Sequence, residues 1–318
     1  MPKFAVIDLG SNSIRMTINE YKKNGEYKVL KNFQAMARLS AKMGKHHTLQ
    51  KNAIGRTLKG LKKFKKELSK YPQIQLRAVA TAAVRQAKNR QVLLKKFKEV
   101  FDQPLEVISG TQEAYFDYLG IINTFPIKDC LIIDTGGAST EIVLVKNGIN
   151  QNLISLPLGA VNLTDNFFEK DKISAKSLFK ATTFLNNAFW NIPWLNKALH
   201  LPIIAIGGSN RALAKISRQK SGLVSLPIHG YHLSDQEVRN IFEHLLSSNL
   251  KERVSIPGLV KHRADIIIGG LLPIIQLLQY INAEQVIFSQ AGLRQGLLFE
   301  KIEKATGNKA LSFRINNI

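Results

Sequence analysis

The stretch that decides the fold is Leu131-Ile-Ile-Asp-Thr-Gly-Gly-Ala-Ser-Thr-Glu-Ile-Val-Leu-Val145, in which a turn of small residues separates two apolar runs of β type. The turn contains Gly136, Gly137, Ala138 and Ser139, whose side chains leave room for several backbone N–H groups to converge on one tetrahedral anion. The same pattern is typical of a plain β-hairpin whose glycines only make the turn. The stretch alone leaves both interpretations open.

Two carboxylates frame this turn. Asp134 ends the first apolar run and Glu141 opens the second. Bare carboxylates at these positions would repel a bound phosphate unless a cation lay between them. We therefore expect Mg²⁺, or Mn²⁺, between Asp134 and Glu141.

A second copy of the pattern lies at the N-terminus, between Phe4 and Ile18. Asp8-Leu-Gly10-Ser11-Asn12-Ser13-Ile-Arg15 aligns with the segment from Asp134 to Glu141, and Asp, Gly and Ser recur at identical offsets. The repeat indicates an internal duplication, with two similar α/β halves that each contribute one loop to a shared site. Gly10, Ser11, Asn12 and Ser13 are thus further candidates for phosphate binding, and Asp8 is the alternative metal ligand.

Length and composition predict two domains in a chain of 318 residues that is 45% hydrophobic. Phe125-Pro126 marks the expected junction, which gives domains 1–124 and 125–305 and a polar tail 306–318.

The longest apolar run, Ile266 to Ile275, is interrupted by glycines and a proline and is too short to cross a bilayer. The N-terminal strand leaves no room for a signal peptide, and Cys130 is the only cysteine, so we expect a reducing cytoplasm.

Positive charge is concentrated in the first half of the chain. The net charge is +22, and residues 1–124 hold 24 lysines and arginines against 9 acidic residues. This balance suits a nucleic acid, a membrane surface or a polyphosphate chain equally well. Between Lys51 and Lys70 the apolar residues fall on one helical face and lysines on the other, which is typical of a solvated face or of a rim that guides an anionic chain.

Three further positions are candidates for chemistry. Arg85 follows the expected strand Gln75–Thr81, where it can clamp phosphate or be an ordinary surface arginine. Ser109 and Gln112 can form a capping box, which leaves Glu113 as a partner of the helix dipole or as a catalytic base. Gly207 and Gly208 join a buried strand to a helix, as in an anion or nucleotide site or in a plain tight turn.

Other catalytic classes lack their signatures. The chain has no Gly-x-x-x-x-Gly-Lys-Ser/Thr loop, no Cys-x-x-Cys and no Gly-x-Ser-x-Gly elbow. His229 and His232 are close in sequence, but no further cysteine or histidine cluster completes a zinc site.

Taken together, four motifs resemble those of the exopolyphosphatase/guanosine pentaphosphate phosphohydrolase family, and the resemblance covers nearly the whole chain. They are the two aspartate–glycine loops, the segment Ser109-Gly-Thr-Gln-Glu113-Ala and the segment Ile206-Gly-Gly-Ser-Asn-Arg211. The resemblance implies an α/β fold of two duplicated actin-like (ribonuclease H-like) domains flanking a cleft. It also implies that Glu113 is the catalytic carboxylate, that Asp134 and Glu141 hold Mg²⁺, that Arg85 binds phosphate, and that the protein is a homodimer. No His-Asp dipeptide is present, so the chain is similar to the short two-domain form.

The expected activity is hydrolysis of the terminal phosphoanhydride of inorganic polyphosphate, with no nucleic acid and no membrane as partner. One alternative is the same reaction on guanosine pentaphosphate. A kinase of the same superfamily would need a sugar-binding signature that the loops lack, and a non-catalytic polyphosphate or nucleotide sensor would not need Glu113. Ala138 and Gln112 replace a glycine and a glutamate common in the family, which leaves the substrate preference open.

Overall fold

The computed structural model describes residues 1–44, 46–169 and 171–307, so the predicted polar tail 306–318 lies almost entirely outside the described residues. The chain divides into two compact units. The first comprises Met1–Pro126 together with the chain from Gly292 onward, and the second comprises Ile127–Ala291.

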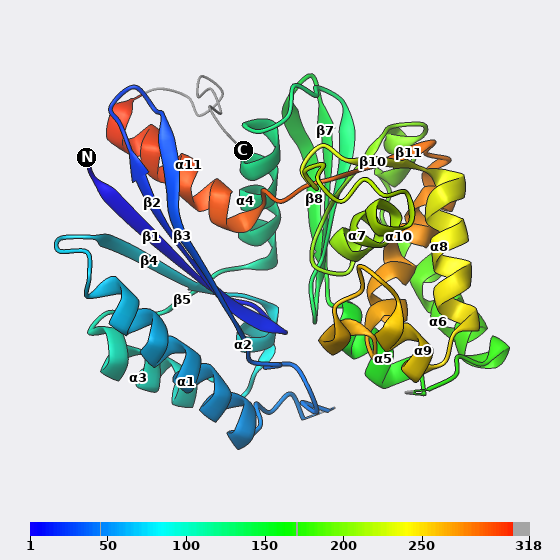
Figure 1. Cartoon of the computed structure of the whole chain (residues 1–318), viewed down its shortest axis with the longest axis horizontal. Helices are drawn as coiled ribbons and strands as arrows, with labels where there is room; N and C mark the ends of the chain where they lie inside the picture. The colour runs from blue at the N-terminus through cyan, green and yellow to red at the C-terminus, as the bar shows by residue number, and fades with distance from the viewer. Residues whose placement is uncertain (45, 170, 308–318) are drawn as a thin grey trace. The chain divides into compact units, whose positions relative to one another are not determined.

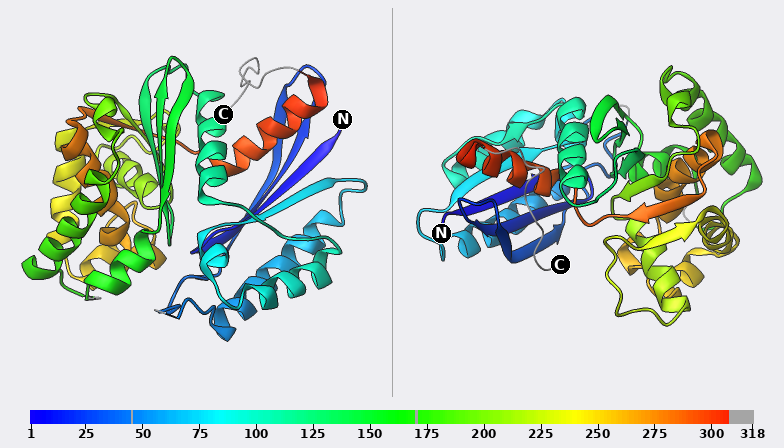
Figure 2. Two further views of the ribbon diagram at one scale, coloured as in Figure 1. Left: turned by 180° about the vertical axis from the view of Figure 1, so that it is seen from behind. Right: turned by 90° about the horizontal axis from the view of Figure 1, so that it is seen from above.

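The first unit is built on a five-stranded sheet in the order β3-β2-β1-β4-β5. The strands are β1 Lys3–Leu9, β2 Ser13–Tyr21, β3 Tyr27–Met36, β4 Gln75–Ala80 and β5 Glu106–Val107, and the helices are α1 Lys51–Leu68, α2 Ala82–Gln86, α3 Arg90–Phe101, α4 Gly110–Ile122 and α11 Leu293–Thr306. Helices α1 and α3 cover one face of the sheet, and α4 and α11 cover the other (Figures 1 and 2). Leu61, Phe64 and Leu68 of α1 are buried, which confirms the apolar face predicted for this helix.

The second unit contains a six-stranded sheet in the order β10-β11-β9-β6-β7-β8. The strands are β6 Cys130–Thr135, β7 Thr140–Lys146, β8 Ile149–Leu156, β9 Ile203–Ile206, β10 His232–Ser234 and β11 Gln285–Phe288. The helices are α5 Ala160–Phe167, α6 Ala175–Trp190, α7 Asn210–Lys220, α8 Asp235–Ser247, α9 Leu250–Ser255 and α10 Ile267–Ile281, with 3₁₀ turns η1 Leu195–Ala198 and η2 Lys261–Arg263. The most apolar helix, α10, packs against β6 and against α5, α6, α7 and α8.

The two sheets repeat one topology. The order β3-β2-β1-β4-β5 of the first unit recurs as β8-β7-β6-β9-β11 in the second, with β10 added at the edge. In both, the first three strands form an antiparallel meander and the next strand runs parallel to the first. The expected α/β fold of two duplicated units is confirmed. No helix among the described residues is long and apolar enough to span a membrane.

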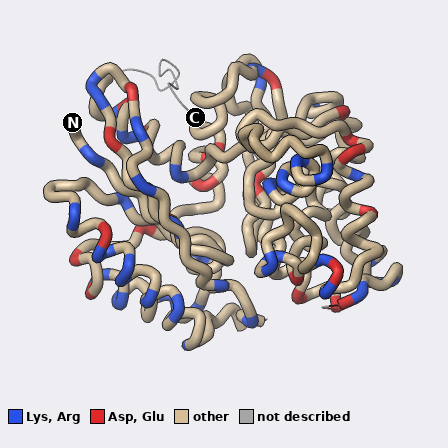
Figure 3. Tube along the Cα trace, in the orientation of Figure 1, with Lys and Arg blue, Asp and Glu red and all other residues tan. Residues whose placement is uncertain are grey.

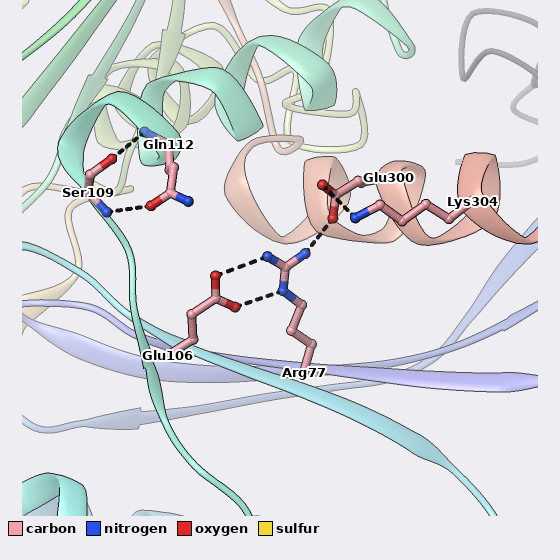
Figure 4. Close-up of polar contacts among 6 residues, drawn as sticks. All are labelled: Arg77, Glu106, Ser109, Gln112, Glu300 and Lys304. Atoms are coloured by element: carbon pink, nitrogen blue, oxygen red, sulfur yellow. Dashed lines mark hydrogen bonds and ion pairs between the residues drawn. The ribbon is translucent and has the colours of Figure 1, made fainter.

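The last helix differs from the sequence-based division, which placed residues up to 305 in the second half. Helix α11 follows β11 but packs on α4 and β1 of the first unit. Arg77 of β4 donates to Glu106 and also to Glu300 of α11, and Glu300 in turn accepts from Lys304 (Figure 4). The Arg77–Glu300 ion pair connects α11 to the first sheet.

The start of α11 is fixed by close backbone contact with α4. The Leu293 N–H donates to the buried Asp117 carboxylate at 2.8 Å. A Cβ on Gly296 would lie 2.0 Å from the carbonyl oxygen of Phe116, and one on Gly120 would lie 2.6 Å from that of Gly292. The two helices approach to a distance that only glycine permits at these positions.

Replacing Gly296 by alanine should therefore lower the thermal midpoint, because the new methyl group meets backbone and overpacking costs about 1–3 kcal/mol. Gly55→Ala is the matched control. Gly55 lies in α1 with nothing within 4 Å of its built Cβ, so alanine there should stabilise the helix by up to about 1 kcal/mol. Equal midpoints for the two variants would contradict the close α4–α11 packing.

Candidate active site

The β6–β7 loop is supported by the start of helix α5. The carbonyl oxygens of Gly136 and Gly137 accept from the N–H groups of Ala160 at 2.9 Å and Val161 at 2.8 Å. In a planar trans peptide the C=O and the following N–H point in opposite directions, and the described chain has no cis peptide. The N–H groups of Gly137 and Ala138 therefore point away from α5. This orientation presents them as donors to an anion.

Gly159 makes this support possible. A Cβ at Gly159 would lie 2.7 Å from the Ala138 nitrogen and 2.8 Å from that of Ser139, so the loop and the start of α5 touch through their backbones. Asn162 accepts from the Gly159 N–H at 2.6 Å and donates to the Ala138 carbonyl at 3.3 Å. Sequence reasoning missed both residues, because they lie about twenty positions beyond the loop that they hold.

The β1–β2 loop is built on the same principle. The Ser11 carbonyl accepts from the Ser40 N–H at 3.0 Å, and the Asn12 carbonyl accepts from the Arg38 N–H at 2.8 Å. The N–H groups of Asn12 and Ser13 thus point away from the segment 37–40. The Ser11 hydroxyl accepts from the Ala83 N–H at 3.2 Å, which ties this loop to the start of α2.

Asp134 and Glu141 face each other across the β6–β7 pair. They are register partners, so both side chains lie on one face of the sheet. Glu141 is 2% exposed and accepts from the Ser155 hydroxyl at 2.7 Å. Gly207 packs against the other carboxylate: its φ is +100°, and a Cβ there would lie 2.8 Å from Asp134 Oδ1.

This donor set fits a hard divalent cation. Mg²⁺ typically takes one or two carboxylates and completes its octahedron with water and phosphate oxygens. Among the residues that the structure describes, no group of three His, Cys, Asp or Glu side chains could hold a metal without such help. The pair therefore suits Mg²⁺ or Mn²⁺ better than a closed zinc site.

The equivalent pair in the first unit carries a different charge. Asp8 is the register partner of Arg15, and Arg294 of α11 also acts on it. Burial raises the pKa of Asp8, and the two arginines oppose that rise. Burial also lowers the pKa of Arg294 to about 10, with Arg15 adding to the effect and Asp8 opposing it. Asp8 as a metal ligand remains a prediction, and its neighbours are cationic.

Arg85 and Glu113 are brought together by the first unit. Ser109 and Gln112 exchange hydrogen bonds at the start of α4, which confirms the capping box (Figure 4). Glu113 lies in the first turn of this helix. Arg85 Nη1 donates to Glu113 Oε2 at 3.1 Å and to the Ile108 carbonyl at 3.0 Å. The side chains are only 22% and 12% exposed. The arginine and the carboxylate are therefore held together in a largely buried position.

The Gly207–Gly208 turn joins β9 to α7 at the carboxylate pair. A Cβ on Gly208 would lie 2.2 Å from the guanidinium carbon of Arg263, so that arginine covers the turn. The parallel β6–β9 register sets Asp134 opposite Ile206, which places Gly207 beside Asp134. Arg263 carries no local sequence signal and was not among the predicted site residues.

The comparisons with known proteins identify the family of the chain. The model of the Ppx/GppA phosphatase family matches residues 18–305. The chain belongs to this family. It is 30% identical over 315 residues to a bifunctional 3-dehydroquinate synthase/phosphatase of Fusobacterium nucleatum, covering 94% of this chain and 46% of the relative. It is also 30% identical to a guanosine-5'-triphosphate,3'-diphosphate pyrophosphatase of Vibrio parahaemolyticus, covering 96% of this chain and 61% of the relative.

Solved structures show the same fold. The Aquifex aeolicus member of the Ppx/GppA family superposes with a TM-score of 0.79 at 28% identity, over 95% of this chain and 98% of that one. An exopolyphosphatase from Cytophaga hutchinsonii gives a TM-score of 0.88 at 23% identity, over 97% and 99% of the two chains, which bears on the fold alone. The expectation of a Ppx/GppA phosphatase is thus confirmed at the level of the family, although the chain spans only 46% and 61% of the two relatives' lengths.

If Asp134 and Glu141 hold the cation, Asp134→Asn and Glu141→Gln should each raise the Mg²⁺ concentration that gives half-maximal phosphate release, because each removes a charged oxygen ligand. Ser155→Ala should raise it by about tenfold, since it removes only the hydrogen bond that orients Glu141. Glu243→Gln, an exposed change on α8, is the control. Unchanged Mg²⁺ dependence in both carboxylate variants would place the cation elsewhere.

Proposed function

We propose that the protein is an Mg²⁺-dependent exopolyphosphatase, which hydrolyses the terminal phosphoanhydride of inorganic polyphosphate and releases orthophosphate. Family membership supports phosphatase activity. The observation that favours polyphosphate as the substrate is the positive charge of the chain. The net charge is +22, and residues 1–124 carry most of the excess. A polyanion of many phosphates gains more from such a field than a nucleotide does.

The residues have separate roles in the proposed reaction. The N–H groups of the two glycine loops and the Arg85 guanidinium bind the terminal phosphate and stabilise the charge of a loose transition state. A bound Mg²⁺ would neutralise phosphate oxygens next to Asp134 and Glu141. Glu113 orients the attacking water and accepts its proton, and the ion pair with Arg85 holds the Glu113 carboxylate in place for this task.

Guanosine pentaphosphate is the second candidate substrate. The Gly207–Gly208 turn lies against Asp134 and beneath Arg263, which is a suitable arrangement for a second anionic group of a nucleotide. The Vibrio relatives named for guanosine-5'-triphosphate,3'-diphosphate also support this candidate. The reaction would be the same, with the 5′-terminal phosphate as the group released.

Phosphate release from long-chain polyphosphate, guanosine pentaphosphate and ATP, each with Mg²⁺, tests the choice. We expect the highest kcat/KM for long-chain polyphosphate. A higher kcat/KM for guanosine pentaphosphate would select the second candidate, and phosphate transfer from ATP to an added alcohol would contradict both.

Glu113→Gln should lower turnover about a hundredfold to ten-thousandfold, the usual contribution of a positioned base. The amide still accepts a hydrogen bond from Arg85, so the fold and substrate binding should be kept. Asp235→Asn is the matched control, because Asp235 also lies in a first helical turn and pairs with an arginine, Arg239, at 2.8 Å. A stable Glu113→Gln protein with turnover close to that of Asp235→Asn would show that Glu113 only complements its helix dipole.

A further inference from the structure

A row of lysines runs along the outer face of α1. Lys59, Lys62, Lys63 and Lys66 are exposed, and Lys62 and Lys63 each lie three or four residues from both Lys59 and Lys66, so the four form a stripe on one side of the helix. The neighbouring helix α3 adds exposed Lys95, Lys96 and Lys98, and Figure 3 shows basic positions along both helices. We call these seven lysines the basic ridge.

The stripe on α1 is not neutralised by acidic residues. Glu67 is the only acidic residue of α1, and it pairs with Lys70 at 2.8 Å. Within the described parts of the chain, none of the four α1 lysines has an acidic partner at ion-pair distance. A solvated helix face usually mixes both signs of charge, so a stripe of one sign costs repulsion that a bound polyanion would relieve.

The two helices that carry the basic ridge begin near Arg85 of the candidate site. Asn89, just before α3, accepts from the Leu49 N–H at 2.9 Å and donates to the Leu49 carbonyl at 3.0 Å, which ties the starts of α1 and α3 together. Arg90, the first residue of α3, donates to the Arg85 carbonyl at 3.3 Å. Both helices therefore start beside Arg85. At a rise of about 1.5 Å per residue, Lys59 to Lys66 lie about 12 to 22 Å along α1 from its start, so the lysines lead away from that end of the helix.

The chemistry of the ridge favours a chain of phosphates over a nucleic acid. Proteins that bind single-stranded nucleic acid combine positive charge with aromatic side chains that stack on the bases. Phe64, Phe97 and Phe101 are the aromatic residues of α1 and α3, both fully described, and all three are buried. The ridge offers charge and no stacking surface.

We propose that the basic ridge binds the part of a polyphosphate chain that extends beyond the terminal phosphate at Arg85. The proposal rests on the proposed function, since it takes the reacting end of the polymer to lie at the Arg85–Glu113 pair. It assigns the ridge to affinity for long chains and not to the chemical step.

The test uses Lys62→Gln/Lys63→Gln/Lys66→Gln in the full chain. The matched control is Lys172→Gln/Lys176→Gln/Lys180→Gln, which removes the same charge from exposed positions before and on α6. Equilibrium binding of long-chain polyphosphate and of tripolyphosphate is measured in the Glu113→Gln background with Mg²⁺, at 50 and 200 mM salt, so that no turnover interferes. Phosphate release from tripolyphosphate is measured in the active background.

We expect the ridge variant to bind long-chain polyphosphate at least tenfold more weakly at low salt and to bind tripolyphosphate unchanged. If all three lysines contact phosphate, the slope of log affinity against log salt should fall by about two. Its kcat on tripolyphosphate should equal that of the unmodified protein. The control triple should match the parent in every measurement.

The proposal would be overturned if the ridge variant lost equal affinity for tripolyphosphate and for long chains. It would also be overturned if the control triple variant lost as much affinity for long chains as the ridge variant does. Tighter binding of single-stranded RNA than of polyphosphate at equal charge would overturn it as well. Failure of the proposed function gives a different result: the active protein would release no phosphate from polyphosphate, while the ridge variant would still lose long-chain binding.

Discussion

Both candidate phosphate loops depend on one constraint, namely that their carbonyl groups are held on one side. In the β6–β7 loop the first N–H groups of α5 do this, and the same hydrogen bonds satisfy donors that a helix start leaves without partners. In the β1–β2 loop the segment 37–40 provides the donors instead. Because a peptide group is planar, fixing the carbonyls fixes the neighbouring N–H groups toward the opposite side. The small residues of the loops then leave that side open.

The duplicated hairpins share their register but not their charge. Asp134 faces Glu141, whereas Asp8 faces Arg15. Two carboxylates at opposed positions repel each other unless a cation lies between them, while an aspartate beside an arginine is already compensated. Arg294 adds a second positive charge near Asp8, and it reaches Asp8 because α11 packs on the first unit. The duplication thus places a pair of carboxylates, which we propose as the cation site, in one copy and an arginine-lined carboxylate in the other.

Local sequence signals predicted the parts of the site that form within a few residues. The strand–loop–strand repeat and the Ser109–Gln112 capping box are of this kind, because both partners lie in one short segment. The Arg85–Glu113 ion pair joins residues 28 apart, and the Arg77–Glu300 pair joins residues 223 apart. Such contacts follow from the strand order, which no periodicity in the chain encodes. The assignment of α11 to the first unit and the support from Gly159 were missed for the same reason.

The geometry of the Arg85–Glu113 pair would allow one arginine to contact both the proposed base and a bound phosphate. Both of its hydrogen bonds use Nη1, and within the described residues Nε and Nη2 of Arg85 donate to no protein atom. A guanidinium is rigid and planar, so a phosphate bound at its remaining donors would be held at a fixed distance from the Glu113 carboxylate. A lysine has one flexible ammonium and could not fix that distance. The proposed attack of water requires such spacing, since the base must reach the water while the phosphate stays in line.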